Sequence, residues 1–260
     1  MEKNLKLLIA TKKSIITLVA LLLVLVLSII GVSTTDSESV FLGRSPKRVP
    51  IYCVDTQEKI VALSFDATWG ADKTLGILDV LKEYGASATF FAVGMWVEKY
   101  SDKLKTLSDS GIMEIGTHSN NHPDMAKLSR QDILLELETS VNIIENVTGN
   151  KVDLFRAPYG SYSDTLIETA EELGLFTIQW DVDTLDWKGL SAGDICQRVL
   201  NKVKPGSIVL MHNDGENTLS ALPLMLEGLK QKGYKCVKIG DMIYRKNFTV
   251  DHTGKQIRST

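Results

Sequence analysis

From residue 59 onward the chain alternates short apolar runs with longer amphipathic stretches, and this alternation restricts its fold more than any other feature. Residues 60–65 have the composition of a strand. Residues 74–84 follow with apolar side chains at helical spacing, and Gly85 stands as a helix stop. About seven such units succeed one another without a break in composition. Repeated strand–helix units favour an α/β fold with one parallel barrel or doubly wound sheet.

The other expected elements follow the same pattern. Strands are expected at residues 88–93, 114–116, 153–155, 176–180, 207–211 and 234–239. Helices are expected at residues 100–110, 129–147, 163–173, 192–203 and 221–232. In parallel α/β folds, catalytic groups gather beyond the carboxyl ends of the strands. Residues at those ends are therefore the first candidates for a functional site.

The N-terminal part of the chain has the pattern of an export and membrane segment. Lysines in residues 1–13 precede an uncharged apolar run at residues 14–32, close to the roughly 20 residues that a membrane-spanning helix needs. We expect a cytoplasmic basic segment, a transmembrane signal anchor at 14–32 and an extracytoplasmic linker at 33–58. A cleaved signal peptide is the alternative, although its apolar region is usually only about 7–15 residues long. The expected location is the cell membrane, with a single span and an extracytoplasmic domain at 59–245.

The net charge and the cysteines give no reason to expect nucleic-acid binding or thiol chemistry. The formal net charge of −3 gives no reason to expect a nucleic-acid partner. Cys53, Cys196 and Cys236 lie far apart and form no CxxC pair, so we expect small buried side chains without chemistry of their own. Residues 246–260 are expected to form a polar tail.

Histidines occur at two of the expected strand ends. His118 and His122 follow the strand at 114–116, and His212 ends the strand at 207–211. A histidine pair at this spacing can bind one metal ion if the turn between them is helical. A single histidine in a loop is more often a core or surface residue. The prediction of a metal site therefore rests on the spacing of the pair.

Charged residues follow other expected strands. Asp66 comes after residues 60–65, Arg156 after 153–155, and Asp183 and Asp186 after 176–180. Acids, an arginine and histidines that converge at one end of a parallel sheet make a site for metal-assisted hydrolysis.

Five motifs containing these residues resemble the polysaccharide deacetylase (NodB-homology) family, and most of all its PdaB-like sporulation branch. They lie in order at residues 64–70, 118–122, 156–160, 183–187 and 210–212. The resemblance covers nearly all of residues 60–241. It implies a distorted (β/α)7 barrel and a hydrolase that removes the acetyl group from the nitrogen of an amino sugar.

The resemblance also implies roles for single residues. Asp66 is expected to be the general base, oriented by Arg156. His212 is expected to be the general acid, oriented by Asp186, because a neighbouring carboxylate raises the pKa of a histidine. His118 and His122 are expected to bind a divalent metal, most simply zinc.

The expected substrate contacts surround these groups. The backbone N–H of Tyr159 is expected to stabilise the oxyanion. Trp69 and Trp187 are expected to stack on sugar rings, although packing in the core is the alternative for some of the tryptophans.

The first motif departs from the family pattern. The family usually has a second aspartate that serves as the third metal ligand, and Ala67 stands at that position. Asp72 is a candidate to replace it, although an aspartate at a helix start is the simpler interpretation.

Two functions follow from this departure. The first is an active N-deacetylase on cell-wall glycan, most plausibly peptidoglycan. The second is a glycan-binding or morphogenetic pseudoenzyme with a degenerate metal site. Ala67 favours the second, whereas the intact Asp66, Arg156, Asp186 and His212 favour the first.

Overall fold

The computed structural model describes residues 19, 21–23 and 47–259. The chain divides into two units, residues 1–47 and 48–260, and the fold below is that of the second. Residues 19 and 21–23 are helical. The expected basic segment, most of the expected membrane anchor and the first part of the expected linker lie outside the described residues. Within the described residues, no helix has the length and apolar character needed to cross a membrane.

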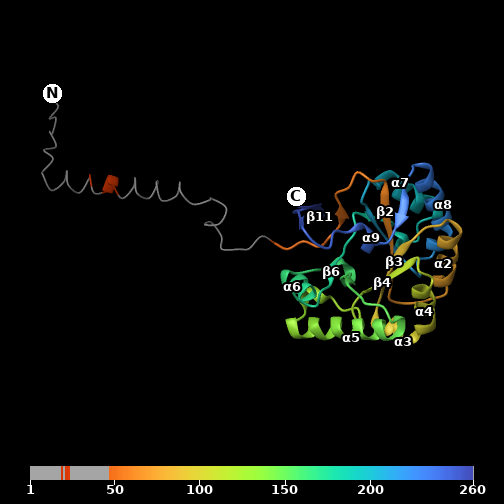
Figure 1. The fold of residues 1–260 in the computed structure, drawn as a ribbon, viewed down its shortest axis with the longest axis horizontal. Helices are drawn as coiled ribbons and strands as arrows, with labels where there is room; N and C mark the ends of the chain where they lie inside the picture. The colour runs from red at the N-terminus through yellow and green to blue at the C-terminus, as the bar shows by residue number, and fades with distance from the viewer. Residues whose placement is uncertain (1–18, 20, 24–46, 260) are drawn as a thin grey trace, which may run out of the picture. The chain divides into compact units, whose positions relative to one another are not determined.

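A curved parallel sheet forms the centre of the domain (Figure 1). Its strands run in the order β6-β5-β4-β3-β2-β8-β7, every neighbouring pair is parallel, and β9 also pairs with β2. The strands are β2 (Ile60–Ala67), β3 (Ala88–Ala92), β4 (Met113–Thr117), β5 (Leu154–Phe155), β6 (Phe176–Thr177), β7 (Val182–Asp183), β8 (Ile208–His212) and β9 (Lys235–Val237). The seven strands of the main path form a distorted half-barrel.

Burial on both faces explains why the central strands read as apolar runs. Every residue of β3 is buried, and in β2 only Ile60 is partly exposed. A parallel sheet that is covered on both faces needs apolar side chains at successive positions. Asp66 is therefore a charged group inside a strand whose neighbours are buried and apolar.

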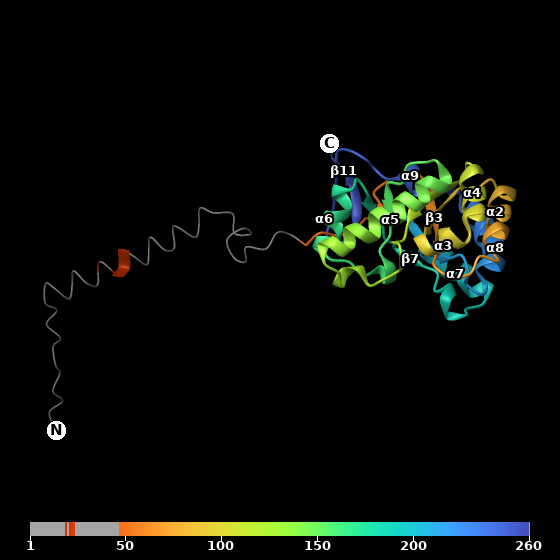
Figure 2. The same cartoon turned by 90° about the horizontal axis from the view of Figure 1, so that it is seen from below.

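Helices cover the outside of the sheet (Figures 1 and 2). They are α2 (Thr74–Glu83), α3 (Gly94–Lys99), α4 (Ser101–Asp109), α5 (Arg130–Thr148), α6 (Asp164–Glu172), α7 (Ala192–Lys202), α8 (Thr218–Gln231) and α9 (Ile239–Met242). Helix α5 packs against α3, α4 and α6, and α8 packs against α7 and α2. Ser129, Ser163 and Ser191 cap α5, α6 and α7 by accepting a backbone N–H bond.

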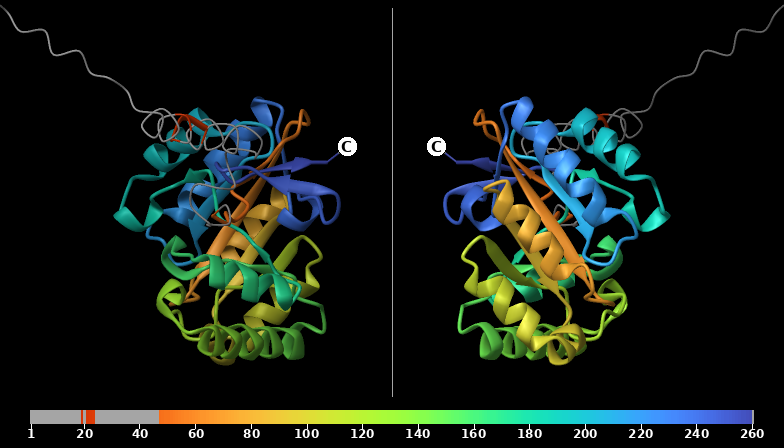
Figure 3. Two further views of the ribbon diagram at one scale, coloured as in Figure 1. Left: turned by 90° about the vertical axis from the view of Figure 1, so that its left-hand side faces the viewer. Right: turned by 90° about the vertical axis from the view of Figure 1, so that its right-hand side faces the viewer.

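A second, three-stranded sheet joins the two ends of the described domain (Figure 3). Strand β11 (Lys255–Arg258) pairs in parallel with β1 (Cys53–Val54) and antiparallel with β10 (Phe248–Val250). Residues 246–260, expected to form a polar tail, therefore include two strands. Gln256 is fully buried here, and its side chain bonds the backbone of Tyr244 through both its oxygen and its nitrogen.

Most expected elements are present, with three differences. The expected distorted (β/α)7 barrel is present as a half-barrel, because β6 and β7 end the strand order and do not pair with each other among the described residues. The expected strand at 176–180 is limited to β6, and β7 forms separately. Helix α3 was not expected, because six residues are too few to show a helical pattern.

Candidate active site

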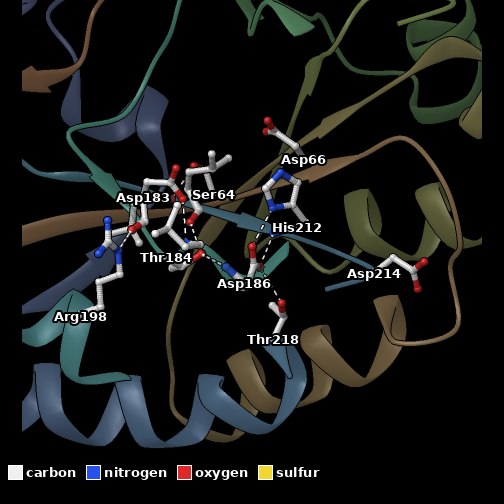
Figure 4. Close-up of polar contacts among 12 residues, drawn as sticks. Ser64, Asp66, Asp183, Thr184, Asp186, Arg198, His212, Asp214 and Thr218 are labelled. Carbon is white, nitrogen blue, oxygen red and sulfur yellow. Dashed lines mark hydrogen bonds and ion pairs between the residues drawn. The ribbon is translucent and has the colours of Figure 1, made fainter. Parts of the chain in front are cut away.

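Asp66 and His212 lie side by side at the carboxyl end of the sheet. Their strands β2 and β8 are neighbours, and the two residues are register partners (Figure 4). Neighbouring strands lie only about 5 Å apart, so the two side chains border the same space above the sheet. The loops after β4, β5 and β7 bring the other motif residues to this end.

Asp66 forms a buried ion pair with Arg156. Arg156 Nη1 donates to Asp66 Oδ1 over 2.8 Å, and the arginine side chain has no exposed surface. Its guanidinium lies 4.2 Å from the ring centre of Phe91 and also donates to the Gln179 carbonyl oxygen. These contacts fix the guanidinium, which in turn fixes the orientation of the carboxylate.

The pair keeps Asp66 ionised in spite of its burial. Burial raises the pKa of the carboxyl group, but the nearby charge of Arg156, with contributions from His118 and His212, outweighs burial and places the pKa below its usual value. A carboxylate that stays deprotonated, with one oxygen facing the pocket, can accept a proton. Breaking a buried pair of this kind costs about 3–5 kcal/mol of folding free energy.

Asp186 holds His212 through two hydrogen bonds. The His212 backbone N–H donates to Asp186 Oδ2 over 2.8 Å, and ring atom Nδ1 donates to Oδ1 over 2.7 Å. The Thr218 hydroxyl also donates to Oδ2 over 2.6 Å (Figure 4). The carboxylate of Asp186 is fully buried, whereas the His212 side chain keeps 33% of its surface exposed. The second ring nitrogen of His212 is therefore left for contacts in the pocket.

The contact between Asp186 and the His212 ring determines the charge of that ring. Burial lowers the pKa of the imidazole, but the hydrogen bond and the negative charge of Asp186 outweigh burial and raise it above the usual value. The pKa of Asp186 shifts in the opposite direction. Burial raises its pKa, but the hydrogen bond and charge of His212 lower it overall. A protonated imidazole beside an ionised carboxylate can donate a proton to a substrate atom.

His118 and His122 are two neutral imidazoles. His118 Nδ1 donates to the Arg156 carbonyl oxygen over 2.8 Å, which leaves Nε2 free, 3.6 Å from Asp66 Oδ2. Burial lowers the pKa of His118, and burial, with a smaller contribution from the neighbouring His118 ring, lowers the pKa of His122 to about 4. The ring centres lie 4.9 Å apart. Residues 118–122 do not form a helical turn, so a loop places this pair.

These residues fit two ligands of a metal site and not three. Neutral imidazoles, one of them held by a backbone carbonyl, are typical metal ligands. A catalytic zinc site usually has three protein ligands. Among the described residues, however, no group of three His, Cys, Asp or Glu side chains is arranged to bind a metal. Ala67 is fully buried beside Asp66, and Asp72 does not line the pocket. The donor set therefore does not fit a three-ligand zinc ion.

Backbone strain is concentrated in the loops of this site. Five non-glycine residues of the described chain have a positive φ angle, and four of them belong to the motif loops. These four are Ser119, His122, Tyr159 and Leu185. A left-handed conformation is unfavourable for residues with a β-carbon and persists where the surrounding structure enforces it. The structure around these loops therefore holds their backbone in conformations that are locally unfavourable.

The site opens into a pocket of about 610 Å³. Asp66, His118, His122 and His212 lie in its wall, together with four aromatic residues: Trp69, Tyr159, Trp180 and Trp187. Three of the aromatic side chains are unusually exposed: Trp69 at 67%, Tyr159 at 71% and Trp187 at 59%. Exposed rings beside a polar pocket suit the flat faces of a sugar. The Tyr159 ring also stands edge-on to His122, 4.6 Å between ring centres.

Sequence reasoning did not identify several residues of this site. Thr218 bonds Asp186 from the first turn of α8, where a threonine has no distinctive pattern. Asn213 is buried and donates to the Gly70 carbonyl oxygen and to Thr74 Oγ1, so it fixes the loop after β2. Gly70 itself has φ near +22°, and a β-carbon there would lie 2.4 Å from Asp214. In the sequence, only its position directly after Trp69 in the first motif indicates that Gly70 belongs to the site.

Comparison with known proteins agrees with this geometry. The family described as polysaccharide deacetylase matches residues 54–178. The chain is 31% identical to the peptidoglycan-N-acetylmuramic acid deacetylase PdaA of Bacillus subtilis, with 75% of each chain covered. It is 35% identical to the peptidoglycan-N-acetylglucosamine deacetylase PgdA of Listeria monocytogenes, covering 76% of this chain and 42% of that one. The chain spans about half the length, 42% to 57%, of the curated relatives that share 35% identity with it.

A solved structure provides a third comparison. BA3943 of Bacillus anthracis, described as a CE4 family pseudoenzyme, is 38% identical and superposes with a TM-score of 0.72. The match covers 76% of this chain and 69% of that one, and a mutant of BA3943 is described as having restored enzymatic activity. With its half-barrel, its five motifs and these relatives, the chain belongs to the polysaccharide deacetylase family.

Proposed function

We propose that this chain is an N-deacetylase that hydrolyses the acetamide of an amino sugar in cell-wall glycan. The observation that carries the proposal is the pocket in which the Asp66–Arg156 and Asp186–His212 pairs border one space from neighbouring strands. Relatives named peptidoglycan deacetylases support the substrate class.

The two pairs supply the two proton transfers of amide hydrolysis. Asp66, kept ionised by Arg156, takes the proton from the attacking water. His212, kept protonated by Asp186, gives a proton to the nitrogen as the carbon–nitrogen bond breaks. Acetate and a free amino sugar are the products. The backbone N–H of Tyr159 stabilises the oxyanion, and Trp69 and Trp187 hold the sugar.

His118 and His122 line the same pocket as neutral imidazoles. Binding of zinc by this pair remains a prediction, and neither proton transfer above depends on it. Membrane anchoring with an extracytoplasmic domain, and a role in sporulation, belong to the same proposal. They rest on the lysine-flanked apolar run and on the resemblance to the sporulation branch.

A glycan-binding protein without turnover is the second candidate. Ala67 at the third ligand position favours it, and so does the 38% identity to a pseudoenzyme. In this case the aromatic pocket would hold a sugar, and the two proton-transfer pairs would serve only its shape.

Acetate release by the full chain tests the proposal. Peptidoglycan fragments and N-acetylglucosamine oligomers are offered to the unmodified chain, to His212→Gln and to His252→Gln. His252 is exposed and lies far along the chain from the motifs, so it is the matched control. We expect His212→Gln to lower the rate about 10²- to 10⁴-fold and His252→Gln to leave it unchanged. A folded, unmodified chain that binds these glycans but releases no acetate would support the second candidate.

A further inference from the structure

A second hollow lies beside the reaction pocket, on the other side of Trp69. It has a volume of about 370 Å³, and we call it the side groove. Thr68 and Trp69 line both hollows, so the two adjoin at Trp69. A linear glycan with one sugar in the reaction pocket would place an adjoining sugar in the side groove.

The loop between the two hollows is firmly held. The Gly70 carbonyl oxygen accepts a hydrogen bond from Trp96 Nε1 over 2.7 Å and from Asn213 Nδ2 over 3.0 Å. Trp96 and Asn213 are both almost fully buried, at 2% and 1% exposure. Trp69, one residue earlier, therefore projects into solvent from a fixed base. A preorganised ring of this kind contributes binding surface with little loss of conformational freedom.

The two hollows differ in charge. In the described chain, no lysine or arginine lines the reaction pocket, whereas Asp183 and Asp214 lie at its wall. Lys73 stands 3.9 Å from Asp214 and offsets part of that charge. The side groove is lined by Thr68, Gly70 and large side chains, and Lys99 is the one charged residue among its described lining residues.

Lys99 is available to a ligand. It forms no ion pair with any residue that the structure describes, and its ammonium lies 5.1 Å from the ring centre of Tyr100. The Lys103 ammonium lies 5.8 Å from the centre of the same ring and donates to the Ala71 carbonyl oxygen over 2.8 Å, although Lys103 does not line the side groove. Two ammonium groups thus lie near the Tyr100 ring. This arrangement attracts a carboxylate to the groove and an apolar sugar face to the ring.

We infer that the side groove is a subsite for a sugar that carries a carboxylate, next to a neutral N-acetyl sugar in the reaction pocket. The inference rests on the proposed function only in taking glycan as the ligand. In an alternating glycan of N-acetylglucosamine and N-acetylmuramic acid, the reacting sugar is then N-acetylglucosamine. The carboxylate that meets Lys99 comes either from the lactyl group of the adjoining muramic acid or from its attached peptide.

Binding affinities of the full chain test the inference, measured by calorimetry with three tetrasaccharides. One is an alternating glucosamine–muramic acid tetrasaccharide without peptide, the second carries the peptide, and the third contains N-acetylglucosamine alone. We expect Lys99→Gln to weaken binding of the acid-bearing tetrasaccharides ~3- to 5-fold, the effect of one partly exposed ion pair. Binding of the third ligand should not change.

Lys105→Gln is the matched control, because Lys105 lies on α4, does not line the groove and pairs with Asp109. Added salt should reduce the preference of the unmodified chain for the acid-bearing ligands. A loss limited to the peptide-bearing tetrasaccharide would identify the peptide as the source of the carboxylate. Equal weakening of all three ligands by Lys99→Gln, or no weakening of any, would overturn the inference.

Acetate release separates this inference from the proposed function. If no ligand is deacetylated but Lys99→Gln still weakens acid-bearing glycans selectively, the deacetylase proposal fails and the subsite stands. If acetate is released and Lys99→Gln changes no affinity, the subsite fails and the deacetylase proposal stands.

Discussion

The two sides of the reaction pocket differ in how complete their functional groups are: the proton-transfer groups on one side and the metal-binding residues on the other. On the His212 side, Asp186 accepts three hydrogen bonds, two from His212 and one from Thr218. On the opposite side, His118 and His122 line the pocket, whereas Ala67, at the position of the family's usual third ligand, is fully buried and does not line it. The groups suited to proton transfer are therefore complete, whereas the metal-binding set is reduced to two imidazoles. The hydrogen bonds around Asp186 are thus complete although Ala67 stands where the family usually has a third ligand.

The largest effect is expected from Asp66→Asn. The change removes the proposed base and leaves the Arg156 charge buried without its partner. We expect acetate release to fall about 10²- to 10⁴-fold and the free energy of unfolding to fall by about 3–5 kcal/mol. Acetate release and urea unfolding measure the two effects. Asp79→Asn, at an exposed position of α2, is the control that should change neither. Normal turnover by Asp66→Asn would remove this residue from the mechanism.

Asp186→Asn should alter the pH dependence of the reaction. Asp186 raises the pKa of His212 against the effect of burial, so His212 stays protonated to higher pH than an ordinary histidine. Without the carboxylate the pKa of His212 falls, and the proton donor is lost at lower pH. We therefore expect the alkaline limb of the rate–pH profile to move to lower pH, with at least about a 10-fold loss of rate at neutral pH. An unchanged alkaline limb would show that another group is the acid.

Ala67→Asp should complete the weaker side of the pocket. The new carboxylate would stand beside the two imidazoles as a third ligand, and three protein ligands are usual for catalytic zinc. We expect zinc affinity, measured by calorimetry, to rise at least about 10-fold, since even an outer contact changes affinity by that factor. Ala67→Asn adds the same volume without the charge and should give a much smaller increase. Equal zinc affinity in Ala67→Asp and the unmodified chain would mean that position 67 does not face the metal.

Trp187→Ala should have the smallest effect. Trp187 is 59% exposed and lines the pocket, so its ring is available to a sugar face. We expect affinity for an N-acetylglucosamine tetrasaccharide to fall about 2- to 10-fold, the range for one aromatic contact. Leu135→Ala removes an apolar side chain that is equally exposed but lies on α5, and it should leave the affinity unchanged. An unchanged affinity in Trp187→Ala would place the sugar elsewhere in the pocket.

The central sheet and the positions of the motif residues could be predicted because they depend on strong local patterns. Strand β2 is apolar at nearly every position, so the charged Asp66 stands out in it. The rule that parallel strands end at one edge then placed Asp66 and His212 together, and they are register partners.

Other features depend on contacts between distant segments. Thr218 reaches Asp186 across 32 positions of sequence, and nothing in its neighbourhood predicts that bond. Strand β10 lies at an edge of the second sheet and β11 between β10 and β1, and both contain polar residues, so their sequence resembles a tail. Strand β11 forms by pairing with β1, about 200 residues earlier in the chain, and β10 forms by pairing with β11.

The most direct test of the account compares acetate release by the unmodified chain and by Ala67→Asp, at equal protein concentration with added zinc. The account predicts that the unmodified chain releases acetate from an N-acetylglucosamine-containing glycan and that Asp66→Asn abolishes the release. Release by Ala67→Asp alone, with a folded and glycan-binding unmodified chain, would contradict it and identify the natural protein as a binding protein.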